Sequence, residues 1–212
     1  SFKNKLTKMP DATPALTSSP FRREVGKSIY DFYTRTYYGV DPADGSALYL
    51  GVLAYNPTNS RLIDNKNGGY DTVTIDHNNA RQDFVGKSSL PDVYGSVVNN
   101  FNYKGFELGI VLTYQIGGYV YDGVYGSLMS TATAGATYHT DILKRWQKPG
   151  DLTNVPRLDN TRSGQFGAAS TRWLTSSTYF SINNISLAYQ LPVNVLAKFG
   201  SSSTRVFVSG EN

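Results

Sequence analysis

Residues 106–116 read Phe106-Glu-Leu-Gly-Ile-Val-Leu-Thr-Tyr-Gln-Ile116. Apolar side chains occupy every even position, whereas the odd positions are mostly small or polar, with Val111 as the exception. Alternation with a period of two indicates a β-strand with one apolar and one polar face. Its length is close to the roughly 9–11 residues that a tilted strand needs to cross a bilayer. The stretch is therefore typical of a transmembrane β-barrel wall, although a strand of a soluble sandwich can also alternate.

In the barrel interpretation, the apolar side chains of this strand face lipid and the polar ones face the lumen. The predicted lipid-facing residues are Phe106, Leu108, Ile110, Leu112, Tyr114 and Ile116. The predicted lumen-facing residues are Glu107, Thr113 and Gln115. Contact between these polar side chains and a cargo does not follow from their position. Burial of Leu108, Ile110 and Leu112 beneath a second protein layer would contradict the assignment.

The preceding residues 93–103 lead into Lys104-Gly105, a two-residue connection that predicts a β-hairpin. With this turn, the apolar positions of both strands fall on one face of the sheet. The predicted pairs are Tyr103 with Phe106, Phe101 with Leu108, Val97 with Leu112 and Val93 with Ile116. Gly95 and Asn99 interrupt that face.

A further strand is predicted over residues 178–191, where the apolar positions change parity near Asn183. This change indicates either a β-bulge or a segment that stands above the membrane. Pro192 ends the strand, and another strand begins at Thr204. Residues 28–38 form an aromatic strand candidate with poor alternation.

Composition agrees with strands and turns, because the 212 residues include 20 Gly and 16 Tyr. The chain has no Cys, which excludes disulfides, thiolate metal sites and cysteine catalysis. No apolar run of about 18 residues predicts a transmembrane helix. The net charge is only +4 and no long basic run occurs, so a nucleic-acid partner is not expected.

Two long stretches, residues 38–91 and 117–175, are rich in residues that favour turns and are predicted to be irregular loops. Loops of this length are unexpected in a compact soluble domain, whereas outer-membrane barrels combine short periplasmic turns with long extracellular loops. The connections after Tyr103 and Leu191 would then be periplasmic. The chain begins without a signal peptide and ends within an expected strand, so residues 1–212 are expected to be a fragment.

Several segments follow one another in the order known from one family. They are Val25-Gly-Lys-Ser-Ile-Tyr-Asp-Phe-Tyr33; Gly39-Val-Asp-Pro-Ala-Asp-Gly45 with Leu48-Tyr49; Gly86-Lys-Ser-Ser-Leu-Pro-Asp-Val-Tyr-Gly95; Asn100-Phe-Asn-Tyr-Lys-Gly-Phe-Glu-Leu108; Arg145-Trp-Gln-Lys-Pro-Gly-Asp151 with Val155-Pro-Arg-Leu158; and Tyr179-Phe-Ser-Ile-Asn-Asn-Ile-Ser-Leu-Ala-Tyr-Gln-Leu-Pro192 with Arg205-Val-Phe-Val-Ser-Gly-Glu-Asn212. Together they cover most of the chain. The set resembles the C-terminal part of SusC/RagA-type TonB-linked outer-membrane proteins of the Bacteroidetes.

The resemblance implies an all-β fold, namely part of a large antiparallel transmembrane β-barrel of about 22 strands with long extracellular loops. Residues 1–212 would be a late portion of that barrel, without the N-terminal domain, the plug and the last strand. Asp71-Thr-Val-Thr-Ile-Asp76 lacks the Gly of the Asp-Gly-Val-Ile-Thr-like stretch found in the family's Asp-rich loop. No functional role is therefore carried over to that loop.

The function implied by the resemblance is nutrient uptake across the outer membrane rather than catalysis. The chain would form part of the SusC-like channel of a SusCD-type complex, which imports glycans or peptides. Its implied partners are a SusD-like surface lipoprotein, TonB-ExbB-ExbD, outer-membrane lipid and the cargo. The sequence does not specify which cargo is carried. It contains no Gly-x-Ser-x-Gly elbow, plausible triad or phosphate-binding Gly loop, so an enzyme is not expected.

The remaining candidate sites have simpler structural interpretations. Asp side chains at positions 41, 44, 64 and 76 could suggest Ca²⁺ in the loops of a full complex, but turn formation is preferred. His77 and His139 are expected in surface loops, because neither has neighbours with metal-ligand spacing. Trp146 and Trp173 could contact a ligand or the lid, although packing within the loops is favoured.

The alternative from a different class is a soluble, secreted β-sandwich that binds carbohydrate through exposed Tyr and Trp side chains. A stable monomer of these residues without detergent would favour the sandwich. Aggregation is expected instead, because an open barrel segment exposes an apolar face and unpaired strand edges.

Overall fold

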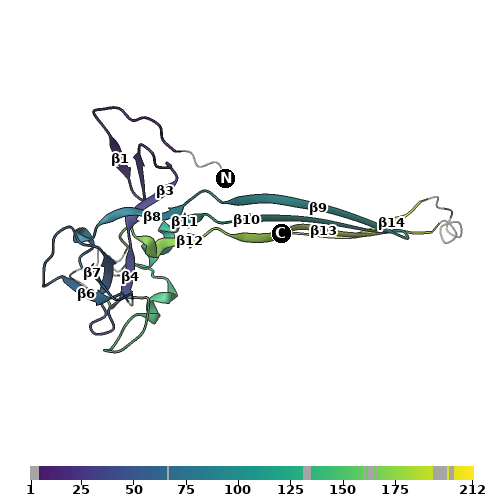
Figure 1. Cartoon of the computed structure of the whole chain (residues 1–212). Coiled ribbons are helices and arrows are strands. Elements are labelled where there is room, and N and C mark those ends of the chain that lie inside the picture. Colours follow the sequence, from purple (N-terminus) through teal and green to yellow (C-terminus); the bar gives the residue numbers. More distant parts are fainter. Residues whose placement is uncertain are drawn as a thin grey trace. The chain divides into compact units, whose positions relative to one another are not determined.

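A computed structural model describes residues 5–65, 67–130, 135–159, 161, 165, 167–192, 200 and 203–212 (Figure 1). β-Strands are the main regular elements of the described residues, and every pairing between named strands is antiparallel. Contacts divide the chain into two units. One, here called the long sheet, contains Leu90–Gly118 and Ser176–Asn212. The other, here called the loop unit, contains Phe2–Ser89 and Tyr119–Thr175.

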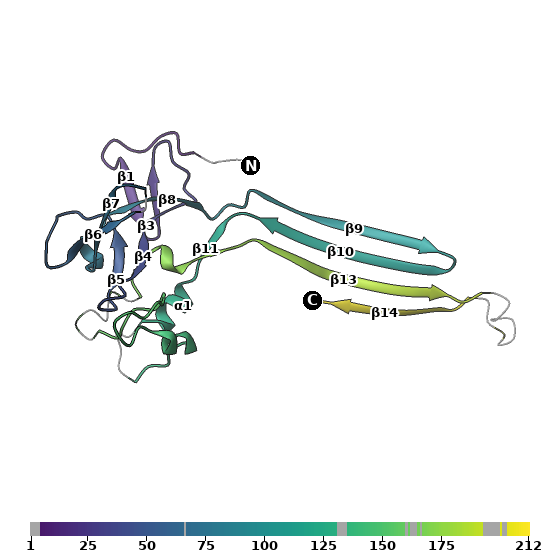
Figure 2. The same ribbon diagram turned by 60° about the horizontal axis from the view of Figure 1, so that its bottom comes forward.

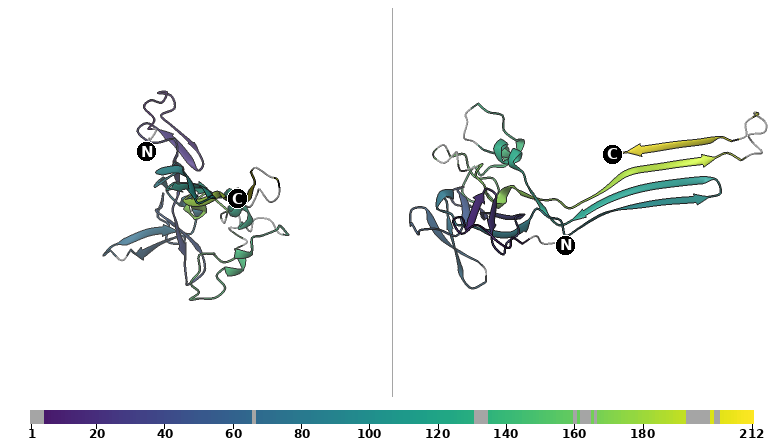
Figure 3. Two further views of the ribbon diagram at one scale, coloured as in Figure 1. Left: turned by 90° about the vertical axis from the view of Figure 1, so that its right-hand side faces the viewer. Right: turned by 90° about the horizontal axis from the view of Figure 1, so that it is seen from above.

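The long sheet has four strands in the order β14-β13-β10-β9, which lie side by side in Figures 2 and 3. The strands are β9 (Val93–Tyr103), β10 (Phe106–Ile116), β13 (Tyr179–Gln190) and β14 (Arg205–Glu211). The β9–β10 hairpin and all four predicted residue pairs are confirmed. Lys104 and Gly105 both have positive φ, as a type I′ turn requires.

A β-bulge resolves the parity change in β13. Val111 pairs with Asn184, whereas Leu112 pairs with Ile182, so Asn183 is the extra residue. Because opposite residues share a face, the bulge returns the apolar positions on both sides of Asn183 to the same face. Of the two alternatives for the parity change near Asn183, the structure shows the β-bulge.

The strand pairing therefore gives the long sheet one mainly apolar face. The apolar face, as named here, carries Val93, Val97, Phe101, Tyr103, Phe106, Leu108, Ile110, Leu112, Tyr114, Ile116, Phe180, Ile182, Ile185, Leu187, Tyr189, Val206 and Val208. Ala188, on the opposite face, is the sole buried hydrophobic side chain among the described residues of this unit. Leu108, Ile110 and Leu112 are partly exposed. The lipid-facing assignment stays a prediction, and the burial that would contradict it is not observed.

The loop unit contains two small antiparallel sheets and a two-stranded ribbon. The first sheet has the order β1-β2-β3-β8, from β1 (Ala15–Ser18), β2 (Phe21–Glu24), β3 (Asp31–Arg35) and β8 (Gln82–Ser88). The second has the order β4-β5-β7-β6, from β4 (Tyr37–Val40), β5 (Ala47–Leu50), β6 (Ser60–Asp64) and β7 (Tyr70–Thr74). The ribbon pairs β11 (Tyr119–Tyr121) with β12 (Leu174–Ser176).

Short helical segments complete the description of the loop unit. They are α1 (Gly123–Leu128) and the 3-10 turns η1 (His77–Asn79), η2 (Thr140–Lys144) and η3 (Thr171–Trp173). Among the residues described, no helix is long and apolar enough to span a membrane.

The prediction that residues 38–91 are irregular is wrong. This stretch contains strands β5 to β8 and most of β4. Its strands have four to seven residues and are separated by turns, so each is too short to show a sustained alternation. The described part of residues 117–175 is largely without strands, as expected, and residues 28–38 contain β3 and the start of β4.

Two buried clusters stabilise the loop unit. Leu48, Val73 and Ile75 form one, against which Leu50 and Ile63 pack. The other consists of Met129, Val155 and Trp173, with Tyr121, Tyr125 and Ile142 packed around it. Both exclude water from apolar side chains within the unit itself, as in a soluble protein.

Candidate functional site

The polar face of the long sheet lies opposite the apolar face and carries the predicted lumen residues. Glu107 of β10 forms an ion pair with Arg205 of β14, with 2.6 Å between Oε2 and the guanidinium nitrogen. The Thr113 hydroxyl donates a hydrogen bond to Asn183 Oδ1 at 2.8 Å. Gln115 donates from Nε2 to the Ser177 carbonyl at 3.1 Å. These contacts place the three residues on one hydrogen-bonding surface, while their exposure to a lumen stays a prediction.

The apolar face has aromatic rings near both ends of the strands. Phe106 lies beside Tyr189 at the hairpin end, with ring centroids 4.4 Å apart. Tyr114 pairs with Phe180 at the other end. Eight residue steps separate Phe106 from Tyr114 along β10, or about 26 Å at the usual strand rise. Strands of outer-membrane barrels tilt by about 35–45°, so this spacing corresponds to about 20 Å along the membrane normal, within the apolar band of about 25 Å that aromatic girdles flank.

Gly95, which interrupts the apolar face in sequence, lies opposite Tyr114. A Cβ at Gly95 would come 2.9 Å from the Tyr114 hydroxyl oxygen. The ring therefore covers the backbone where a side chain is missing, an arrangement that stabilises glycines in designed sheets.

Acidic residues of the loop unit form turns and ion pairs. Arg61 pairs with both Asp41 and Asp44, and the Arg61–Asp44 distance is 2.7 Å. Asp76 caps η1 by accepting a hydrogen bond from the Asn78 amide. Within the described residues, no group of three or more His, Cys, Asp or Glu side chains could hold a metal ion. Calcium in the loops of a full complex stays a proposal without a site here.

The turn at residues 42–45 anchors a distant segment of the loop unit. The Trp146 indole Nε1–H donates to the Pro42 carbonyl at 3.0 Å. Arg157 donates from Nη1 to the Asp44 carbonyl at 2.9 Å, and its backbone amide donates to Gly45 at 2.9 Å. A Cβ at Gly45 would lie 2.5 Å from the Trp146 ring, so Gly allows this close approach. Trp146 thus packs between loops, as the simpler interpretation held.

Trp173 is only 1% exposed and packs with Met129 and Val155. Its indole Nε1–H donates to the Ala168 carbonyl at 3.0 Å. Contact with a ligand or the lid, the second interpretation considered for this residue, is contradicted by its burial, because no ring face is free for stacking.

The prediction that His77 lies in a surface loop is wrong. Its side chain is 6% exposed, packs edge-on against Tyr49 and lies 3.0 Å from the Ala169 carbonyl through Nε2. Burial lowers the pKa of His77 because the charged imidazolium is poorly solvated there. Burial also raises the pKa of Tyr49 to about 12. The residues next to His77 in the sequence do not predict this contact, because Ala169 lies 92 positions away.

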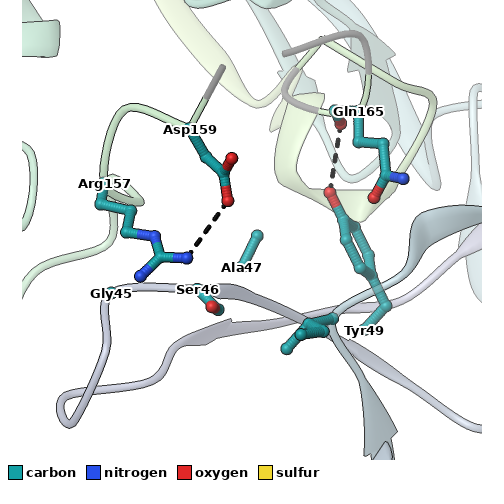
Figure 4. Close-up of a pocket in the computed structure, with 8 residues that line it drawn as sticks. Gly45, Ser46, Ala47, Tyr49, Arg157, Asp159 and Gln165 are labelled. Carbon is teal, nitrogen blue, oxygen red and sulfur yellow. Dashed lines mark hydrogen bonds and ion pairs between the residues drawn. The ribbon is translucent and has the colours of Figure 1, made fainter. Parts of the chain in front are cut away.

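A small pocket lies beside this region and is shown in Figure 4. It is lined by Gly45, Ser46, Ala47, Tyr49, Ile75, Arg157, Asp159 and Gln165. Arg157 pairs with Asp159 at 3.2 Å, and the Tyr49 hydroxyl donates to the Gln165 carbonyl at 3.3 Å (Figure 4). These polar groups hold the walls together, so the pocket has a structural explanation.

Comparison with known proteins supports the family resemblance. TonB-dependent receptor P3 of Formosa agariphila is 26% identical over 223 residues, covering 99% of this chain and 21% of the receptor. TonB-dependent receptor P39 of the same organism is 27% identical over 142 residues, covering 66% of this chain and 13% of the receptor. The chain thus spans about a fifth or less of the length of these relatives. No family model matches it.

Solved structures share the fold. The RagAB peptide transporter matches 98% of this chain and 22% of the transporter chain, with a TM-score of 0.72 and 20% identity. The same importer in its open-open state matches with a TM-score of 0.68. The resemblance to part of a SusC/RagA-type TonB-dependent receptor is therefore confirmed, together with the antiparallel all-β fold. The matched proteins are named as receptors and transporters, which supports the expectation that the chain is not an enzyme.

Proposed function

We propose that residues 1–212 form part of the wall and extracellular loops of an outer-membrane, TonB-dependent importer of oligomeric nutrients, either glycans or peptides. The observation that carries the proposal is the long sheet, which has one mainly apolar and one mainly polar face. Its aromatic rows and the similarity to TonB-dependent receptors support the same assignment.

Transport on this proposal is gated passage rather than chemistry. The polar face lines the path, and its hydrogen-bonding groups stay solvated while the apolar face meets acyl chains. A SusD-like surface lipoprotein caps the barrel and captures cargo. TonB, energised through ExbB and ExbD, pulls on a plug to open the path. The loop unit lies outside the hydrocarbon zone and contacts the lid and the cargo.

The alternative of a soluble carbohydrate-binding sandwich receives less support. A sandwich packs two sheets face to face, so the inner face of each sheet is buried. In the described residues, Ile182, Ile185 and Leu187 on the apolar face remain 50%, 46% and 45% exposed. This exposure is expected of a sheet that meets lipid, and not of the inner layer of a sandwich.

Uptake in the native bacterium tests the importer proposal. The full-length protein should localise to the outer membrane, and cells that lack TonB should lose uptake of its cargo while keeping the same protein level. The measurement is accumulation of labelled oligosaccharides and peptides, with immunoblots of membrane fractions as the control. Secretion into the medium, or uptake that continues without TonB, would contradict the proposal.

A further inference from the structure

Two arginines of the loop unit, Arg35 and Arg172, lie close together although 137 positions separate them in the sequence. The backbone of Arg35, at the end of β3, forms a parallel bridge with Ser170, so the two segments run side by side. Burial raises the pKa of Tyr49 to about 12, and the charges of Arg172 and Arg35 oppose this rise. Both guanidinium groups are therefore within electrostatic reach of one phenol.

Aromatic rings hold the guanidinium of Arg172 in place. Its Cζ lies 5.2 Å from the centroid of the Tyr37 ring and 4.6 Å from that of the Trp173 ring. Trp173 is itself fixed, because it is buried and its indole donates to the Ala168 carbonyl. An aromatic face attracts the positive charge but offers no oxygen to the five N–H donors of a guanidinium. Arg172 is thus positioned by the fold before any anion binds.

Neither guanidinium has a counter-charge within residues 1–212. All 16 Asp and Glu side chains belong to the described residues, and none of them forms an ion pair with Arg35 or Arg172. Arg35 uses Nε to donate to the Ala80 carbonyl at 3.2 Å, and its Nη atoms have no hydrogen-bond partner in the described chain. The Arg172 side chain likewise donates no hydrogen bond to a described residue. The pair therefore keeps most of its donors for another partner.

Acidic groups in the surroundings already have partners. Asp76, whose charge acts on Arg35, caps η1 by accepting from a backbone amide. Asp141 accepts a hydrogen bond from the Tyr125 hydroxyl at 2.9 Å and pairs with Lys144 at 2.6 Å. Neutralising the two arginines with either carboxylate would break these contacts, so the missing counter-charge is expected to come from elsewhere.

We propose that Arg35 and Arg172 form a carboxylate-binding site, occupied by an Asp or Glu side chain from the part of the same receptor that lies outside residues 1–212. The planar donors of a guanidinium match both oxygens of a carboxylate. The chain spans about a fifth or less of the related receptors, so most carboxylates of such a receptor belong to other segments. The contact joins the loop unit to one of those segments, an assignment that goes beyond the transport proposed above.

A permanent partner suits this site better than a transient one. Burial lowers the pKa of Arg35, because its charge is incompletely solvated. A partly buried charge without a counter-charge lowers stability in every state of the protein. A carboxylate of the same polypeptide has a high effective concentration and offsets this cost at all times. A cargo molecule or a separate lipoprotein would leave both arginines unpaired whenever it dissociated.

Zero-length cross-linking of the full-length receptor in outer membranes identifies the occupant. Arg172→Lys places a primary amine in the site, and a carbodiimide joins this amine to a contacting carboxylate as an amide. Mass spectrometry of tryptic peptides should show one dominant link from position 172 to an Asp or Glu of the same chain outside residues 1–212. Arg35→Lys should link to the same acid. The link should form equally in membranes with and without the lipoprotein.

Arg81→Lys is the matched control for the chemistry. Arg81 lies 3.5 Å from Asp83 in an exposed ion pair, so its lysine variant should link to Asp83. A receptor that yields this link is folded in the loop unit and accessible to the reagent.

Hydrogen exchange measures what the contact contributes. Arg172→Met keeps an apolar side chain against the rings and removes the charge. Exchange of residues 170–174 should become about ten- to hundredfold faster, as expected for loss of a hydrogen bond between charged groups. Changing the linked acid to its amide should have a similar effect, and the double variant should add little to either loss. Arg81→Met should leave exchange of these residues unchanged.

Four outcomes would overturn the site. A link to Asp76 or Asp141 would place the partner within residues 1–212, and a link to the lipoprotein or a cargo peptide would make it a separate molecule. Absence of a link from position 172, in a receptor whose Arg81→Lys control does link, would mean that no carboxylate contacts the site. Additive losses in the double variant would contradict the pairing. None of these readouts depends on TonB or on uptake, so they are distinct from failure of the importer proposal.

Discussion

The long sheet and the loop unit differ in the exposure of their apolar side chains. In the loop unit, Val73 and Trp173 are 0% and 1% exposed, and they lie in clusters built from that unit alone. In the long sheet, Phe180 and Val208 are 68% and 66% exposed. The loop unit follows the rule of soluble proteins, whereas the sheet needs a covering that the described residues do not supply.

The long sheet also has open strand edges beside its open apolar face. All residues of β14 are exposed, and one edge of this strand has no partner among the described residues, as is also true of β9. Open edges and an open apolar face together favour association with other chains or aggregation. On the importer proposal, the long sheet is part of a larger closed sheet in lipid, while the buried clusters of the loop unit resemble those of a domain in water.

The largest expected effect comes from the core of the loop unit. Trp173→Ala should cost about 3–5 kcal/mol of local stability, because it empties a fully buried site. Hydrogen exchange of the full-length protein in lipid should then show loss of protection in α1 and β12. Protection in β10 should persist, because the described members of the Trp173 cluster all belong to the loop unit. Equal loss in both units would show that they do not fold independently.

The next effect tests the two faces of the long sheet. Ile110→Arg should cost roughly 2–4 kcal/mol if this side chain lies near the bilayer midplane. Its neighbour Val111 points to the polar face, so Val111→Arg should cost far less. The measurement is the urea midpoint of unfolding in lipid vesicles, supported by the amount of protein in the outer membrane. If Ile110→Arg had the urea midpoint and the outer-membrane level of the wild type, the apolar face would not contact lipid.

A smaller effect concerns the turn that joins two parts of the loop unit. Gly45→Ala places a Cβ 2.5 Å from the Trp146 ring at a residue with φ of +73°, and should cost about 1–3 kcal/mol. Gly68→Ala is the matched control, since Gly68 has φ of +81° and no atom within 4 Å of the added Cβ. Limited proteolysis should cut residues 145–157 faster in Gly45→Ala. If both variants were cleaved equally fast, the destabilisation would come from an Ala at positive φ and not from the clash with the Trp146 ring.

The same contrast explains what could be predicted from sequence. The β9–β10 register was predictable because alternation continues for eleven residues and a two-residue turn fixes the pairing. The bulge at Asn183 was also visible as a change of parity. The contact of the apolar face with lipid and of the polar face with the lumen stays a prediction, because the strand pairing places side chains on faces and does not identify what surrounds them.

The loop unit was harder to predict because its order comes from long-range contacts. β5 has four residues with two adjacent buried positions, a pattern that does not alternate. The burial of His77 depends on Gln165 and Ala169, which are 88 and 92 positions away. In the long sheet, Tyr94 and Tyr179 can be placed on one face only from the register of three strands, in which both lie opposite Gln115.

The smallest expected effect is a pH dependence confined to the loop unit. Burial lowers the pKa of His77, with Tyr49, Arg35 and Asp76 as the titratable groups around it. The unfolded unit therefore binds a proton more readily than the folded one. The loop unit should therefore keep its full stability above the ordinary histidine pKa of about 6.5. Its stability should fall as the pH drops below that value.

Hydrogen exchange of η1 and β7 at pH 7.5 and 5.5 measures this loss, after correction for the intrinsic exchange rates. His77→Gln can still donate to the Ala169 carbonyl and does not titrate, so it should abolish most of the pH dependence. His139→Gln removes the other histidine, which is partly buried beside Tyr125 and lies outside η1 and β7, and should retain the loss at low pH. Protection in β10 should not change with either variant, because the long sheet contains no histidine. A wild-type loop unit equally protected at both pH values would show that the His77 site admits the imidazolium without cost.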